Sequence, residues 1–174
     1  MNKREYLNRL DELIVELYKP QDKSCLLEAG VMKPISLIKS GINFCLFSFD
    51  KKYKKGQCPN RLFTFYNTIS NAQTMCDYCL MGFKGGQLYV LLFELKKGDD
   101  SVIPQLKAGD EFAKFIINSV NRIHNWNVKP IIRYISVRAS YVLMKPTTRM
   151  SPVEYIDNLY TFKGSSIDVS ACMK

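Results

Sequence analysis

The stretch that most constrains the fold of this chain is residues 76–96, in which a Gly-Gly pair separates two apolar runs. Glycine adopts positive φ angles without steric cost, so Gly85-Gly86 predicts the tight turn of a β-hairpin. Its two strands are predicted at 77–83 and 88–96. Four pairs of residues should then face each other across the hairpin: Lys84 and Gln87, Phe83 and Leu88, Leu80 and Leu91, and Asp77 and Glu94.

Two acidic side chains should therefore meet on one face of the hairpin. Directly opposed residues point to the same side of a sheet with Cβ atoms about 4.5–5.5 Å apart, which brings Asp77 next to Glu94. Lys96 lies two residues further along the same strand and on the same face. Glu94 also ends the apolar run 88–93, which is typical of a buried central strand. Because a buried carboxylate needs a partner, the two candidate compensating groups are Lys96 and a divalent metal ion.

Amphipathic helices are predicted on both sides of the hairpin. Apolar residues recur at helical spacing in the segments 3–18 and 104–124. Gln105 begins the buried face of the second helix, next to the end of the Glu94 strand. Gly109 follows one turn later, where the missing side chain would let the helix lie close to the sheet.

The remaining segments are assigned from their apolar patterns and turn residues. A strand at 130–139 follows the helix 104–124, which predicts a right-handed βαβ unit with parallel pairing to the strand 88–96. The other assignments, in chain order, are one or two short helices at 24–40, strands at 43–50 and 61–66, a polar connection at 67–75, a strand at 141–144, a loop at 146–152, a short helix at 152–160, and a tail at 161–174 that is either an edge strand or disordered.

The length and composition indicate one globular domain that binds a polyanion such as nucleic acid. The 174 residues contain no internal repeat, and 25 Lys and Arg against 16 Asp and Glu give a net charge of +9. That charge favours a polyanion such as nucleic acid, and the alternative is a generally basic surface. No apolar stretch approaches the length of a membrane span, and the charged N-terminus lacks the apolar core of a signal peptide. We therefore expect a cytoplasmic protein without a membrane partner.

The six cysteines are expected to be reduced thiols in that compartment. Cys76-x-x-Cys79 has the spacing of half a zinc site. However, no second such pair exists, His124 is the single histidine, and residues three apart in a strand point to opposite faces. Structural zinc is therefore disfavoured.

Asp77, then Glu94-Leu95-Lys96, then Gln105 resembles the active-site signature of the PD-(D/E)xK nuclease superfamily. That superfamily includes restriction endonucleases and Holliday-junction resolvases. The resemblance covers residues 77–139 and, more loosely, the first helix. It implies a restriction-endonuclease-like α/β core, a mixed β-sheet whose central antiparallel hairpin is flanked by α-helices. The domain would then comprise a core at 43–144, N-terminal helices at 3–40 and a C-terminal extension at 146–174.

The resemblance also implies a reaction, the hydrolysis of phosphodiester bonds with Mg²⁺ or Mn²⁺. Asp77, Glu94 and the backbone carbonyl of Leu95 would bind the metal. Lys96 would position or activate the attacking water, and Gln105 would orient that water or a phosphate oxygen. DNA is favoured over RNA as the substrate, and a homodimer is a plausible form for cutting two strands.

The chain departs from the family pattern at two places. Cys76 stands where many members have proline, a position without a chemical role. Many members also supply an acid from the first helix, and the sequence does not select among four candidates: Glu5, Glu12, Glu16 and Glu28.

Further basic residues are candidate phosphate contacts. Both arginines on the last core strand could reach phosphates or simply pair with acids; Arg138 is assigned to phosphate and Arg133 to pairing with an acid. A cluster in the loop after the strand 43–50 either contacts phosphates or is simply solvated; it comprises Lys51, Lys52, Lys54 and Lys55. Two alternatives to catalysis remain: an inactive nuclease-fold module that binds nucleic acid or a protein, and an ordinary polar network closed by a salt bridge.

Overall fold

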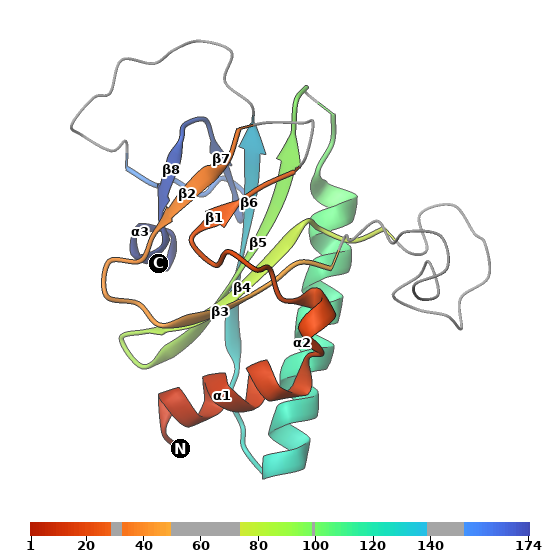
Figure 1. The fold of residues 1–174 in the computed structure, drawn as a ribbon, viewed down its shortest axis with the longest axis vertical. Coiled ribbons are helices and arrows are strands. Elements are labelled where there is room, and N and C mark those ends of the chain that lie inside the picture. The colour runs from red at the N-terminus through yellow and green to blue at the C-terminus, as the bar shows by residue number, and fades with distance from the viewer. Residues whose placement is uncertain (29–32, 50–73, 99, 139–151) are drawn as a thin grey trace.

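The structure is a computed structural model that describes residues 1–28, 33–49, 74–98, 100–138 and 152–174 (Figure 1). The described residues form a mixed α/β fold with two mixed β-sheets and three α-helices. The predicted lysine loop, the strands expected at 61–66 and 141–144 and most of the two connections at 67–75 and 146–152 lie outside these ranges.

A five-stranded sheet forms the centre of the fold. Its strands in spatial order are β3 (Phe44–Phe47), β4 (Tyr78–Lys84), β5 (Gln87–Lys96), β6 (Pro130–Arg138) and β7 (Leu159–Phe162). The first three pair antiparallel, whereas β5, β6 and β7 pair in parallel. The expected parallel βαβ unit is thereby confirmed.

The central hairpin has the predicted register. Lys84 pairs with Gln87, Phe83 with Leu88 and Leu80 with Leu91. Both turn glycines take positive φ, 58° for Gly85 and 93° for Gly86, as a tight hairpin turn requires.

Two helices cover one face of this sheet. Helix α1 (Lys3–Leu13) buries Tyr6, Leu7 and Leu10, and a short 3₁₀ turn (Glu16–Tyr18) follows it, so the helix is shorter than the predicted segment 3–18. Helix α2 (Ile103–His124) runs along the sheet in Figure 1, close to its predicted bounds. The apolar side chains of both helices join those of the sheet in one core cluster.

The expected close approach of α2 is present at Gly109. A Cβ atom at this position would lie 2.4 Å from Cys76 Sγ and 3.6 Å from Leu92 Cδ1. Glycine is therefore required here because the helix backbone touches the residue that precedes Asp77.

The opposite face of the central sheet is covered by a second, three-stranded sheet. It consists of β1 (Cys25–Leu26), β2 (Ile35–Ile38) and β8 (Ser166–Asp168), and the short helix α3 (Val169–Cys172) follows β8. The short helices predicted at 24–40 are therefore wrong. In β2, buried and exposed residues alternate, and this period of two was hidden by apolar residues that also recur at helical spacing.

The short helix predicted at 152–160 is also wrong. Asp157 and Asn158 have φ angles of 48° and 67°, which turn the chain so that Ile156 bridges Leu159. Two consecutive positive φ angles end any right-handed helix. The tail beyond is ordered as β7, β8 and α3, because the parallel pairing of β7 with β6 attaches it to the central sheet.

No helix in the described part of the chain combines the length and the apolar character needed to cross a membrane.

Candidate active site

Asp77 and Glu94 lie where the pairing of β4 and β5 ends. Tyr78 is the first paired residue of β4 and faces Phe93, so the register carried one residue further sets Asp77 opposite Glu94. Both residues are buried, with exposed fractions of 7% and 3%. Asp77 accepts the backbone N–H of Leu95 through Oδ2 at 2.6 Å, which adds one hydrogen bond beyond the end of the ladder.

Lys96 contributes a positive charge to this site. Its Nζ lies 2.9 Å from Glu94 Oε1. The hydrogen bond with Glu94 raises the pKa of Lys96 above its ordinary value, against the opposing effect of burial, and the charges of Asp77 and Glu28 raise it further. Lys96 is therefore a protonated ammonium held against a nearly buried carboxylate.

Glu28 is the N-terminal acid that acts on this site. Of the four candidates from the sequence, it is the one that contributes to the raised pKa of Lys96. Glu12 instead pairs with Arg9 at 2.8 Å. Glu28 belongs to the segment after β1, and not to α1, from which the resemblance would take an acid.

Tyr78 holds the segment that carries Glu28. Its hydroxyl donates to the carbonyl oxygen of Leu27 at 2.7 Å and accepts the N–H of the same residue at 3.0 Å. These two hydrogen bonds tie the segment that ends at Glu28 to the start of β4, on the face of the sheet opposite the helices.

Replacing Tyr78 with phenylalanine is expected to lower the free energy of unfolding by about 1 kcal/mol, because one hydroxyl makes both hydrogen bonds to Leu27. Urea unfolding measures this change. Tyr89→Phe is the matched control, because the Tyr89 hydroxyl has no hydrogen bond with any residue in the described ranges, and it should shift stability by less than about 0.5 kcal/mol. Equal effects of the two substitutions would show that the Leu27 hydrogen bonds contribute nothing.

Ser136 is a member of this site that the sequence reasoning missed. It pairs with Glu94 across β5 and β6 and is fully buried. Its Oγ has no hydrogen-bond partner among the residues that the structure describes. The signal was present, since parallel pairing of 88–96 with 130–139 brings a single serine within an apolar strand next to the glutamate.

Gln105 lies in the first turn of α2, on the helix-covered side of the sheet. It is one helical turn from Gly109, which touches the residue before Asp77. Its Oε1 is buried and, within the described ranges, accepts no hydrogen bond. Gln105 and Ser136 thus provide two buried oxygens with spare hydrogen-bonding capacity.

Arg138 and Arg133 both bind backbone carbonyl groups. Arg138 donates to the carbonyls of Gly98 and, at 2.9 Å, Asp100, and so holds the turn between β5 and α2. Arg133 donates to the carbonyl of Lys174 at 2.8 Å and to Asn158 Oδ1 at 2.9 Å, and forms no ion pair with an Asp or Glu side chain in the described ranges. The phosphate assignment of Arg138 stays a prediction, because one guanidinium edge already serves the turn.

The donor chemistry of the acid pair fits a hard divalent cation. Such ions are held by one or two carboxylates, with water and substrate phosphates completing the shell. Across residues 1–28, 33–49, 74–98, 100–138 and 152–174, no group of three or more His, Cys, Asp or Glu side chains is arranged to hold a metal ion. The protein would therefore contribute two carboxylates, those of Asp77 and Glu94.

The site lies at the carboxyl ends of the parallel strands β5 and β6, a common place for ligands in open α/β sheets. Comparisons with known proteins identify no relative of this chain: no family model, no curated protein and no solved structure matches it.

Proposed function

We propose that this protein is a metal-dependent nuclease that hydrolyses phosphodiester bonds, with DNA as the favoured substrate. The observation that carries the proposal is the buried acid pair Asp77 and Glu94, with Lys96 at 2.9 Å from Glu94. Burying two like charges side by side costs free energy, and carboxylates in that position are paired with a positive charge or bound to a cation. A divalent cation bound at this site would be coordinated by both carboxylates and would offset their repulsion.

The residues divide the work by their chemistry. Asp77 and Glu94 would hold Mg²⁺ or Mn²⁺, which supplies Lewis-acid stabilisation and a more acidic water molecule when bound. Lys96 would place a positive charge beside the scissile phosphate and orient the attacking water. Gln105, which both donates and accepts hydrogen bonds, would orient that water or a phosphate oxygen.

Two further groups would contribute to the site. The backbone carbonyl of Leu95 is the third metal ligand that the resemblance implies, and its N–H already fixes Asp77. Glu28 acts on Lys96 electrostatically and would help to keep it protonated while Glu94 turns to a metal.

The arrangement of elements supports a restriction-endonuclease-like core as part of the same proposal. An antiparallel hairpin carries the two acids, and the helix after it crosses to a parallel strand. A helix precedes the sheet and packs on the same face as α2.

A cleavage assay tests the proposal. Supercoiled DNA, linear DNA and RNA are incubated with the protein in Mg²⁺, Mn²⁺ or EDTA. We expect cleavage with either metal ion, with DNA cut faster than RNA, and none in EDTA. Binding of nucleic acid without cleavage at any metal concentration would instead identify an inactive nuclease-fold module.

A further inference from the structure

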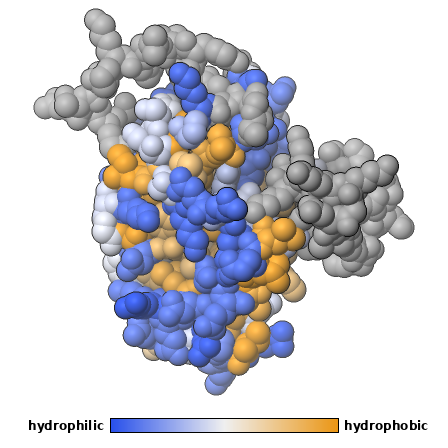
Figure 2. All heavy atoms as spheres, in the orientation of Figure 1, coloured by the Kyte–Doolittle hydropathy of each residue, from blue (hydrophilic) through white to orange (hydrophobic). Residues whose placement is uncertain are grey.

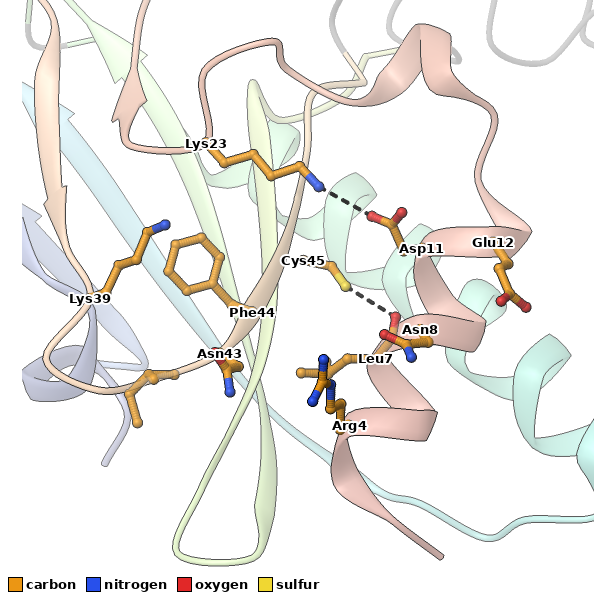
Figure 3. A pocket seen from close by; sticks show the side chains of 11 residues that line it. Arg4, Leu7, Asn8, Asp11, Glu12, Lys23, Lys39, Asn43, Phe44 and Cys45 are labelled. Atoms are coloured by element: carbon orange, nitrogen blue, oxygen red, sulfur yellow. Dashed lines mark hydrogen bonds and ion pairs between the residues drawn. The ribbon is translucent and has the colours of Figure 1, made fainter.

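A polar groove of about 660 Å³ lies between α1 and the start of β3, apart from the acid pair (Figure 3). Arg4 and Asn8 project from α1 on one side. Lys39, Asn43 and Phe44 come from the segment that leads into β3 on the other. Hydrophilic side chains dominate this part of the surface in Figure 2. The volume is within the range of about 300–1,000 Å³ that is usual for small-molecule sites.

The two sides of the groove are tied together. The Cys45 thiol donates to the carbonyl oxygen of Leu7 at 3.2 Å, which fixes β3 against α1 at the floor. Lys23 reaches across one end to Asp11 at 3.4 Å. The groove therefore exists before any ligand arrives, which lowers the entropic cost of binding.

The acids that line the groove are already neutralised. Asp11 lies 3.0 Å from Lys19 Nζ as well as near Lys23, and although burial raises its pKa, these two lysines outweigh that effect and bring the pKa below its ordinary value. Glu12 pairs with Arg9.

The cations that line the groove are not neutralised in the same way. Neither Arg4 nor Lys39 forms an ion pair with an acid in the described part of the chain. Hydrogen bonds from Ser24 are the main cause of the lowered pKa of Asp22, and Lys39 makes a smaller contribution without forming an ion pair with it. The groove thus carries surplus positive charge that favours an anion.

The side chains between these cations can bind a nucleobase as well as an anion. Asn8 and Asn43 each offer a donor and an acceptor, the pattern that the edge of a nucleobase requires. The half-buried ring of Phe44 offers a stacking surface, with Lys39 Nζ 5.6 Å from the ring centre. A phosphate held at either side of the groove, by Arg4 or by Lys39, would place an attached base near the asparagines and the Phe44 ring.

We propose that this groove binds a nucleoside phosphate, either as a free nucleotide or as one unit of a nucleic-acid strand. Arg4 and Lys39 bind the phosphate, Asn8 and Asn43 read the base, and Phe44 stacks on it. This assignment does not depend on hydrolysis by the acid pair.

Isothermal titration calorimetry in EDTA tests the assignment without cleavage. The probes are thymidine 5′-monophosphate, the trinucleotide pTpTpT and inorganic phosphate. The wild type should bind at least one of the two nucleotides more tightly than inorganic phosphate. The Arg4→Gln/Lys39→Gln variant should lose about tenfold or more of that affinity, because it removes charge-assisted hydrogen bonds. A preference for the trinucleotide identifies a strand as the source, and equal affinity identifies a free nucleotide.

The matched control is Lys107→Gln/Lys163→Gln, which removes the same net charge from exposed residues outside the groove. It should change affinity by less than about twofold, and circular dichroism melting checks that both double variants fold. An equal loss of nucleotide affinity in the two variants would show that only the net charge matters, and the assignment of this groove would be wrong. Failure of the nucleotides to bind, or inorganic phosphate binding as tightly as they do, would overturn it as well. Loss of cleavage in the separate metal assay leaves this result untouched, so the two proposals fail independently.

Discussion

Replacing Glu94 with glutamine is expected to lower metal-dependent cleavage by about 10³-fold or more, while the protein stays folded. The substitution keeps the shape of the side chain and removes the negative charge that faces both Lys96 and the proposed cation. A loss of this size corresponds to about 4 kcal/mol of transition-state stabilisation, which is typical for the removal of one preorganised electrostatic group. Single-turnover cleavage rates at saturating Mn²⁺ measure it.

Glu111→Gln is the matched control, because Glu111 is an exposed residue on α2 and should leave the cleavage rate unchanged. Lys96→Met separates catalysis from a purely structural network. The nuclease proposal expects it to abolish cleavage with a modest loss of stability. If Lys96→Met mainly lowers the melting temperature and Glu94→Gln retains wild-type cleavage, the acids and the lysine form a structural salt-bridge network and the proposed function is wrong.

Replacing Gly109 with alanine is expected to lower the free energy of unfolding by about 2 kcal/mol. In an exposed helix position this change would stabilise by about 1 kcal/mol, because alanine is the better helix former. Here the new Cβ would lie 2.4 Å from Cys76 Sγ and 3.3 Å from Cys76 Cβ, and overpacking of a buried contact costs about 3 kcal/mol. Urea unfolding monitored by circular dichroism measures the difference.

The Cys76→Ala background tests the cause of this loss. With the sulfur removed, Gly109→Ala should cost less than about 0.5 kcal/mol, and the two substitutions together define a double-mutant cycle. Gly98→Ala is the control, because nothing lies within 4 Å of a Cβ built there. A Gly109→Ala variant as stable as the wild type in both backgrounds would show that α2 can move away from the sheet without cost.

The central hairpin and the helix after it were predictable because their signals are local. Gly85-Gly86 specify the turn, and one turn sets the register of every pair along β4 and β5. The buried face of α2 repeats over many residues, which distinguishes a helix from a strand. The register of this hairpin also sets the positions of Asp77, Glu94 and Lys96.

The errors fall where pairing comes from distant segments. Strand β2 pairs in parallel with β8, from the other end of the chain, and antiparallel with only two residues of β1. Nothing within 24–40 announces that partner, and four residues are too few to separate a strand from a helix by periodicity. The helix predicted at 152–160 failed for a different reason: Asp157 and Asn158 are polar residues that tolerate positive φ, and their turn signal was overlooked.

The candidate site divides in the same way: the residues placed by local structure were predicted, and those placed by distant segments were not. The acid pair and Lys96 follow from the hairpin alone. Ser136 required the register of a parallel pair, and Glu28 required a tyrosine hydroxyl that binds a backbone segment from another sheet. The serine stands out in its strand, but its alignment with Glu94 and the attachment of Glu28 both depend on pairing between distant segments.

The hydrogen bonds of Tyr78 to Leu27 have a consequence for how the site is assembled. Closing the hairpin joins groups that are near in the chain, so the loop-closure entropy of bringing Asp77, Glu94 and Lys96 together is small. Glu28 is joined only when a long loop closes across two sheets, and the hydroxyl of Tyr78 secures that closure. The acid pair and Lys96 thus belong to the hairpin as a local unit, whereas the charge of Glu28 acts on Lys96 only in molecules whose two sheets have docked.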